Sequence, residues 1–440
     1  MLSAFVRAFK TPDLRKKILF TLAIMAIYRF GTHVPSPGVD YNLVQQCLDN
    51  ADMSGNVLGM INLFSGGAMV QLSVFALGIM PYITAAIIVQ LLTVVIPRFE
   101  QLKKEGQAGQ TKMTQYTRYL TIGLAVLQAS TLVTIAREPA RLFGGTCATV
   151  MPDDGWPQLV LMVLTMTAGT GLIMWLGELI TEKGVGNGMS LLIFVSIAAS
   201  FPAALTQIYS RSVSTFVLVM LLGLAVMTLV VYVEQCQRRI PVQYAKRMIG
   251  RRQYGGTSTY IPLKLNMANV IPIIFASSIL MLPSLLANFN RPTQTGEVAP
   301  GWVTFIDRYL SMGMTQGTHW VYMLAYTVLI IFFAFFYTSV TFNPTDVADN
   351  MKRYGGFIPG IRAGRPTAEY LEYVLNRITT PGSLYLAGLA LIPLIAFNAL
   401  QVADFPLGGA SIIIIVGVGL QTVKQIESQL QQHDYEGFLR

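Results

Sequence analysis

The sequence predicts an all-α fold, a polytopic bundle of ten membrane helices arranged as two inverted five-helix halves. Three observations predict it. Charged residues make up only 12% of the chain, against about 25% in soluble domains, and the mean hydropathy is +0.53. Apolar stretches of membrane-spanning length recur along the chain, and positive charge alternates between the loops that join them. Two short motifs also return five spans later.

The ten spans are apolar windows of about 19 residues. They cover residues 18–37, 72–96, 118–137, 157–177, 189–208, 215–234, 266–287, 320–342, 380–400 and 407–424. Most of the 31 lysines and arginines fall on alternate loops and on the two ends of the chain. Because positive residues gather on the cytoplasmic side of a membrane, both termini are expected inside the cell.

The chain is expected to divide into four parts. A cytoplasmic segment 1–17 precedes a first half 18–210, a second half 211–424 and a cytoplasmic tail 425–440. No removable signal peptide is expected, because no small-residue cleavage site follows the first apolar run.

The second span follows an interrupted apolar stretch. Residues 57–97 are roughly twice as long as the ~20 residues that cross a bilayer core. A polar, glycine-rich break at 62–68 leaves a half-segment, 58–70, ahead of the full span. Irregular backbone at membrane depth survives only inside protein or against a watery cavity, because lipid cannot satisfy its amides. The sequence therefore predicts a cavity that holds this half-segment.

Two pairs of motifs, each five spans apart, indicate an internal repeat. Residues 78–83 match residues 269–274, with a proline two positions before an isoleucine, and residues 188–193 and 409–414 both read Gly-x-Ser-x-x-Ile. Because five is an odd number, the second half is inverted in the membrane, an architecture that places a site near the midplane. The motifs direct five isoleucines to that depth: Ile79, Ile83, Ile193, Ile274 and Ile414. These are either ordinary core or lipid-facing residues, or a hydrophobic constriction against ions.

Two loops on the inner side are long and basic. The first, 235–265, carries Arg238, Arg239, Lys246, Arg247, Arg251 and Arg252, and the second, 343–379, carries Lys352, Arg353 and Arg362. Their charge could simply set topology or contact anionic lipid. Their length favours a folded, protruding docking surface, whose sign suits a phosphate backbone or an acidic protein.

Ionisable residues inside the spans are few. Arg29 is the clear exception, and it is expected to reach the interface or to bond to carbonyl groups in the bundle. The three histidines and three cysteines have no metal-ligand or acid–base spacing, so neither a metal, a cofactor nor an enzyme is expected. An inverted-repeat solute transporter is the alternative, but it would need an intramembrane acid or histidine. What remains is a cavity whose isoleucines have no hydrogen-bond preference and so could close around many different peptide side chains.

At these residues the chain resembles the bacterial SecY family, the central subunits of the Sec protein translocon. The resemblance covers essentially the whole chain. It rests on the motifs at 62–68, 75–83, 103–106, 115–119, 175–178, 186–188, 244–247, 275–278, 342–344 and 359–362. It implies an hourglass pore in the bacterial inner membrane. Such a pore passes unfolded secretory polypeptides and releases signal sequences and membrane helices sideways into lipid.

The resemblance also implies roles for residues. The half-segment 58–70 would be a plug half-helix, with Asn62, Phe64, Ser65, Gly66 and Gly67. The pore ring would hold Ile79, Ile83, Ile193, Ile274, Ile414 and a sixth isoleucine, Ile279. A lateral gate between the second and third spans and the seventh and eighth would contain Thr84, Gln90, Ser277 and Ser278.

The partners that the resemblance implies are of several kinds. SecE and SecG would be partner subunits, and the basic loops would dock the SecA ATPase or the ribosome. Nascent chains and preproteins would be the substrates, and membrane lipids would surround the bundle. SecDF and YidC are candidate accessory partners.

Overall fold

Long helices dominate the computed structural model, which describes residues 9–44, 65–137, 155–244, 247–249, 252–254, 258–289, 300–310, 320–400 and 409–438. Every predicted span overlaps one of these helices, so the predicted helical bundle is confirmed. In chain order they are α2 (Pro12–Gly31), α5 (Met80–Val95), α7 (Gln107–Ala136), α9 (Trp156–Lys183), α10 (Gly188–Arg211), α11 (Val213–Gln235), α12 (Ile271–Phe289), α14 (Trp320–Thr341), α16 (Arg365–Leu400) and α17 (Gly409–Phe438).

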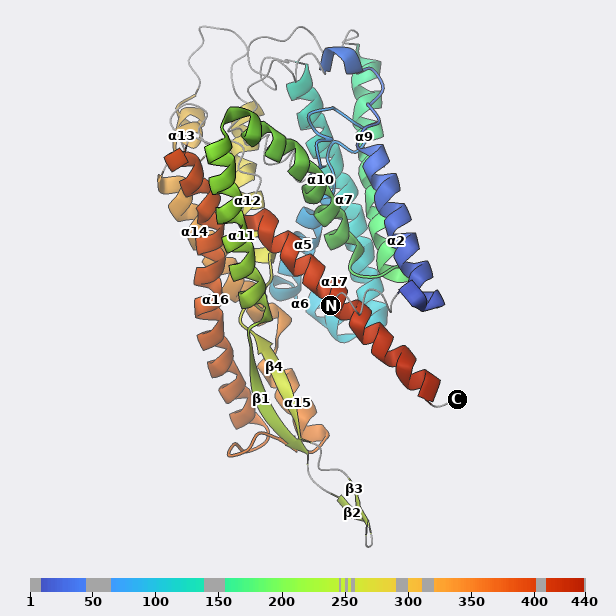
Figure 1. Cartoon of the computed structure of the whole chain (residues 1–440), viewed down its shortest axis with the longest axis vertical. Helices are drawn as coiled ribbons and strands as arrows, with labels where there is room; N and C mark the ends of the chain where they lie inside the picture. Colours follow the sequence, from blue (N-terminus) through green and yellow to red (C-terminus); the bar gives the residue numbers. More distant parts are fainter. Residues whose placement is uncertain are drawn as a thin grey trace.

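The helices form two groups that lie side by side (Figure 1). In the first group α7 packs against both α5 and α9, and α10 packs against α2 and α9. In the second, α14 packs against both α12 and α16, while α17 packs against α11 and α16. The groups meet where α10 contacts α11 and α17, and where α5 contacts α12. A shorter helix, α13 (Gly301–Tyr309), packs against α12.

Length and hydropathy alone mark three helices of the described chain as full membrane spans: Trp156–Lys183, Phe216–Gln235 and Trp320–Arg353. A bent pair, α5 with α6 (Pro97–Lys104), adds a fourth, with an angle of 100° between the two helices. Fewer helices qualify than the ten predicted spans. Among the helices that do not qualify, α10 and α12 contain an internal proline, and α2 carries basic residues near both ends.

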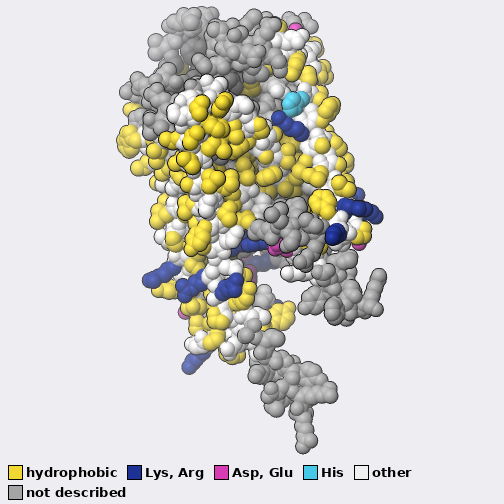
Figure 2. Space-filling model, viewed as in Figure 1, with side chains coloured by type: hydrophobic (Ala, Val, Ile, Leu, Met, Phe, Trp, Pro, Cys, Tyr) yellow, Lys and Arg dark blue, Asp and Glu magenta, His cyan; other side chains and the backbone are white. Residues whose placement is uncertain are grey.

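The face of the bundle seen in Figure 2 is largely apolar. Large hydrophobic side chains stand exposed on α2, α9, α11 and α14, including Phe30, Leu164, Leu221, Leu224 and Phe332. Soluble proteins rarely expose contiguous apolar surface on this scale, whereas a lipid-facing surface requires it. On the visible face, lysine and arginine gather toward the end of the bundle from which residues 237–244 and 258–264 protrude.

The predicted start of the second span is wrong. That span was expected from residue 72, but α5 begins at Met80, and residues 66–79 pass through consecutive turns. We refer to residues 65–79 as the turn segment. Its backbone is tied to the chain after α2, since Val74 N donates to Val34 O (2.9 Å) and Ser36 N donates to Leu72 O (3.0 Å). Protein groups thus satisfy this irregular backbone, as a membrane interior demands.

The first basic loop folds as a β-hairpin, which the all-α prediction did not include. β1 (Gln237–Tyr244) pairs antiparallel with β4 (Ser258–Lys264), and its end also pairs with β5 (Gly356–Phe357). Short strands β2 (Arg247–Ile249) and β3 (Arg252–Tyr254) pair with each other farther along the hairpin. In β1, Ile240 and Val242 are buried while their neighbours are exposed. This alternation is the period of two of a β-strand, and the sequence shows it as branched apolar residues two positions apart.

The two basic loops form one structure. Ile240, Val242 and Leu263 of the hairpin share a buried cluster with Met351 of α15 (Pro344–Arg353) and Leu371 of α16. The second loop therefore supports the first, and the pair protrudes from one end of the bundle (Figure 1).

Candidate functional site

The repeat motifs mark equivalent helix starts. Gly78 (φ 56°) and Asn269 (φ 51°) have left-handed backbone, and a helix begins two residues after each of them. In both α5 and α12 the second residue is proline and the fourth is isoleucine, Ile83 or Ile274. The other motif pair also falls at helix starts, since α10 begins at Gly188 and α17 at Gly409. The echo seen in the sequence therefore extends to backbone conformation.

Four of the six predicted ring isoleucines come together. Ile79, Ile193 and Ile414 are buried in one cluster that also includes residues of α2 and α9, and Ile83 packs against it. We call this the isoleucine cluster. Ile274 is buried but does not belong to it. Ile279 is 37% exposed and lies about 140° around α12 from Ile274, given 3.6 residues per turn.

Val270 is a cluster contact that the sequence analysis missed. It packs against the isoleucine cluster, although it was not among the predicted ring residues. The signal was present in the repeat, because Val270 is the counterpart of Ile79 when Pro81 is aligned with Pro272. A branched apolar side chain ahead of each helix start was therefore readable from the alignment.

Arg29 holds the start of the turn segment. Its Nη1 donates to the carbonyl oxygen of Gly66 at 2.6 Å, which confirms the prediction that this arginine bonds to a carbonyl. Gly66 has a φ of 67°, and a Cβ there would lie 3.3 Å from Arg29 Nη1 and 3.2 Å from Ser196 Cα. Ser65 Oγ accepts from Met69 N (3.1 Å), and Gly67 is also left-handed at φ 90°. Asn62 and Phe64 lie outside the described residues.

The neighbouring residue of α2 reinforces this attachment. Tyr28 is fully buried, stacks on Phe75 of the turn segment with ring centroids 5.9 Å apart, and shares a 2.6 Å hydrogen bond with Ser196 Oγ of α10. Gly66 near the start of the turn segment and Phe75 nearer its end are thus both held by α2.

An aromatic seam joins the two helix groups. Ile87 of α5, Phe275 of α12 and Phe333 of α14 form a buried cluster, here called the seam cluster. The Phe275 and Phe333 rings meet edge to face with centroids 5.4 Å apart. Ile83 packs against both the seam cluster and the isoleucine cluster, so the two are continuous.

The polar residues predicted for the gate lie on α5 and α12. Thr84 Oγ1 donates to Met80 O (3.0 Å) and Ser277 Oγ to Ile274 O (2.9 Å), so both hydroxyls bond within their own helix. Gln90 is half-buried. The Ser278 hydroxyl is buried and has no hydrogen-bond partner among the described residues.

A lysine of the predicted motif at 103–106 also crosses between the groups. Lys103 Nζ, on α6, donates to Val340 O (3.1 Å) near the end of α14. Cations are favoured at helix C-termini, where carbonyl groups lack intrahelical partners. The seam between the groups is therefore closed by apolar packing in the bundle and by a polar contact at its end.

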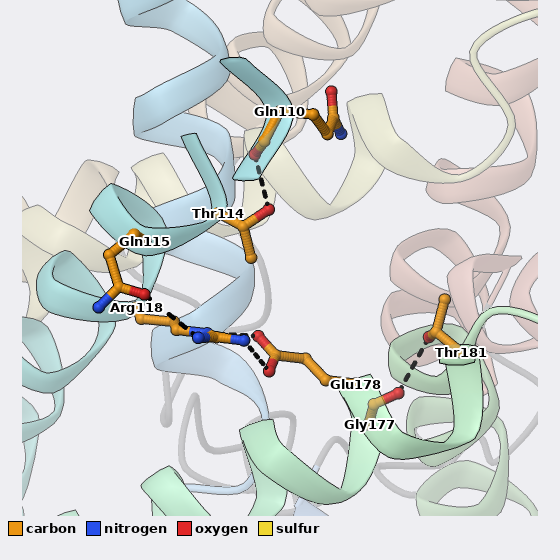
Figure 3. A network of polar contacts seen from close by, with 7 residues as sticks. All are labelled: Gln110, Thr114, Gln115, Arg118, Gly177, Glu178 and Thr181. Atoms are coloured by element: carbon orange, nitrogen blue, oxygen red, sulfur yellow. Dashed lines mark hydrogen bonds and ion pairs between the residues drawn. The ribbon is translucent and has the colours of Figure 1, made fainter. Parts of the chain in front are cut away.

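A bidentate ion pair braces the first group (Figure 3). Arg118 of α7 donates through Nε to Glu178 Oε1 (2.9 Å) and through Nη2 to Glu178 Oε2 (2.6 Å), while its Nη1 donates to Gln115 Oε1 (3.2 Å). Paired N–H groups of an arginine fix a carboxylate in one orientation. This contact sets α7 against α9.

The basic residues of the two loops share the protruding end. Arg238, Arg239, Lys352, Arg353 and Arg362 are exposed, and the Arg239 guanidinium lies 4.8 Å from the centre of the Tyr260 ring. Arg247 and Arg252 lie in β2 and β3, whereas Lys246 and Arg251 fall outside the described residues. Among the described residues no cluster of His, Cys, Asp and Glu could hold a metal ion.

Comparison with known protein families identifies the family of a chain with this arrangement. The SecY family model matches residues 73–423, which include both helix starts of the repeat and both basic loops. The chain belongs to the SecY family. It is 61% identical to the protein translocase subunit SecY of Streptomyces galbus and 56% identical to that of Mycobacterium leprae, and each alignment covers 100% of both chains.

Solved structures show the same SecY-type fold. The structure of a protein conducting channel aligns with a TM-score of 0.61 at 17% identity, over 94% of this chain and 91% of that one. The idle yeast Ssh1 complex bound to the yeast 80S ribosome aligns with a TM-score of 0.62 at 18% identity, over 93% and 90%. The predicted polytopic membrane bundle is confirmed, and as a SecY family member the chain is a multi-pass subunit of a protein translocase.

Proposed function

We propose that this protein is the pore subunit of a translocase in the bacterial inner membrane, with both termini in the cytoplasm. It passes unfolded secretory polypeptides across the membrane and releases signal sequences and membrane helices into lipid. The chain provides the path, and a partner supplies the energy, so no catalysis of its own is required. The observation that carries the proposal is the junction of two helix groups at the isoleucine cluster, with equivalent helix starts on both sides.

The pore constriction consists of Ile79, Ile83, Ile193, Ile274 and Ile414, with Ile279 as the sixth candidate. Branched apolar side chains exclude water from a narrow passage and thereby block ions. They offer no hydrogen-bond preference, so they can close around many different peptide side chains. The burial of Ile79, Ile193 and Ile414 together supports a shut state of this constriction.

The plug is the segment 58–70, with Asn62, Phe64, Ser65, Gly66 and Gly67. The rest of the turn segment, residues 71–79, is its hinge, because backbone bonds fix Leu72 and Val74 to the chain after α2, while Arg29 holds Gly66 of the plug itself. This insert has no counterpart in the second half of the repeat. That supports a plug added to a pore that the two halves, 18–210 and 211–424, build together.

The lateral gate is the seam between α5 and α7 on one side and α12 and α14 on the other. The seam cluster provides its apolar packing, and Thr84, Gln90, Ser277 and Ser278 are its polar residues. Helices in lipid associate through packing and hydrogen bonds and not through a hydrophobic driving force. Such a seam can therefore part to admit an apolar segment at modest cost.

The protruding basic structure docks the SecA motor or the ribosome. Exposed Arg238, Arg239, Lys352, Arg353 and Arg362 supply charge for an acidic protein surface or for phosphate groups. SecE and SecG complete the complex, with SecDF and YidC as accessory partners. The translocase names of the relatives give the solute-transporter alternative no support.

Photocrosslinking tests the proposed path directly. A photoreactive residue at position 83, in the assembled complex, should crosslink to a stalled exported chain. The same probe at exposed Leu221 on α11 should not. No crosslink from position 83 in an assembled, engaged complex would refute the channel.

A further inference from the structure

Glu234 is a buried carboxylate at the point where the chain leaves the bundle. It lies in the last turn of α11, just before the hairpin begins, and is 8% exposed. Asn266, 3% exposed, lies just after the hairpin ends. Asn266 Nδ2 donates to Glu234 Oε1 at 2.6 Å, so this hydrogen bond joins the two ends of the hairpin.

The same amide group reaches the start of α12. Asn266 Nδ2 also donates to the carbonyl oxygen of Asn269 at 3.2 Å, which uses both of its hydrogens. Asn269 is the left-handed residue that precedes α12, at φ 51°. A non-glycine residue holds that conformation only when its surroundings fix it, and asparagine tolerates it better than most residues. Asn266 therefore links Glu234 to the backbone that sets the start of α12.

Other helices converge on this junction. Leu265 N donates to Cys236 O (3.0 Å), and a Cβ on Gly382 of α16 would collide with the Leu265 carbonyl. The ammonium groups of Lys264 and Lys424 interact electrostatically with Glu234. The Tyr385 hydroxyl of α16 is buried and lacks a hydrogen-bond partner in the described part of the chain. It also interacts electrostatically with Glu234. Elements from α11, α12, α16 and α17 thus meet around one carboxylate.

Burying a carboxylate costs free energy, which the hydrogen bond from Asn266 and the two lysines offset, so the presence of Glu234 here calls for a role. The isoleucine and seam clusters do not include Glu234, and it is too buried to serve as part of an exposed docking surface. Its contacts lie on the one covalent route from the docking hairpin to α12.

We propose that Glu234 and Asn266 are positioning residues that transmit docking at the hairpin to α12. This inference rests on the proposed function, in which the hairpin docks a motor and α12 lines the lateral gate. A partner that shifts the β1–β4 hairpin moves both of its ends. The Glu234–Asn266–Asn269 contacts convert that movement into a displacement of the first two turns of α12, where Ile274 and Phe275 lie.

The test compares three single variants, one double variant and one control in complexes reconstituted into liposomes. Glu234→Leu and Asn266→Leu remove the hydrogen bond, whereas Glu234→Gln keeps an acceptor oxygen of the same reach. Glu182→Leu, an exposed carboxylate at the end of α9, is the matched control. The measurements are the affinity for SecA, the rate of preprotein translocation at saturating SecA, and the resting ion conductance.

Glu234→Leu and Asn266→Leu should each bind SecA with an affinity within twofold of that of the unchanged channel, yet translocate preprotein at least fivefold more slowly. Glu234→Gln should retain at least half of the rate, and Glu182→Leu all of it. The double variant Glu234→Leu with Asn266→Leu should translocate no more slowly than the slower single variant, because the two substitutions remove the same contact. SecA affinity within twofold shows that each variant is folded and assembled, and unchanged resting conductance shows that it is shut.

Two results would overturn the inference. One is normal translocation by Glu234→Leu with normal SecA binding. The other is a fall in SecA affinity large enough to match the fall in rate, which would make the pair a brace of the docking surface. Failure of the unchanged channel to bind SecA or to translocate would instead refute the proposed function, so the two failures are distinguishable.

Discussion

Gly78 and Asn269 share a left-handed backbone conformation, with φ values of 56° and 51°, at equivalent points ahead of α5 and α12. The two positions solve one geometric problem with different residues. Each turns the chain so that a helix can begin with proline at its second residue, where the missing N–H costs nothing. The first half uses glycine, which has no steric penalty there, and the second uses asparagine held by Asn266.

This difference predicts unequal tolerance to substitution. Gly78→Ala should destabilise the folded protein by about 1–2 kcal/mol, the cost of left-handed backbone for an ordinary L-residue. Asn269→Gly should be nearly neutral, because the bond from Asn266 uses only the backbone carbonyl of residue 269. The measurement is the unfolding midpoint in detergent. Equal destabilisation by both changes would show that the shared φ is not the constraint.

Arg29 should hold the channel shut. Arg29→Met removes a charged hydrogen bond to Gly66 O, worth about 1.5–3 kcal/mol. The population with a displaced plug should then rise about tenfold or more, since 1.4 kcal/mol is a factor of ten. Resting ion conductance of single channels measures this population. Arg15→Met, an exposed arginine on the same helix, is the control and should leave conductance unchanged.

The ring isoleucines should not contribute equally. Ile83→Gly should increase resting conductance strongly, because Ile83 packs against both the isoleucine cluster and the seam cluster. Ile279→Gly should increase it much less, since that side chain is exposed and lies on a different side of α12 from Ile274. Conductance of the two variants in planar bilayers decides the membership of the ring. A larger leak from Ile279→Gly would place Ile279 in the constriction.

The sequence was informative wherever one periodicity or one charge pattern determined the structure. Apolar windows located the ten long helices, and the repeat located four helix starts, because both are local patterns. The turns at 66–79 were missed since their apolar residues resemble a continued span, and only tertiary bonds to residues 34 and 36 distinguish them. Glu234 and Asn266 were missed for a similar reason. They are 32 positions apart, and their pairing depends on the hairpin between them.

The edge-to-face contact between Phe275 and Phe333 should set how readily the seam opens. When the seam opens in lipid, the two rings separate without becoming exposed to water. The free energy of the contact therefore comes from packing alone, and an aromatic pair contributes about 1 kcal/mol. Phe275→Ala should therefore shift the gate toward the open form by about fivefold. The shift should appear as faster export of a preprotein whose signal sequence has a shortened apolar core. Leu324→Ala truncates an exposed side chain of α14 that is not part of the seam cluster, and it should leave export unchanged. If Phe275→Ala exports that preprotein no faster than Leu324→Ala does, the seam cluster does not limit gate opening.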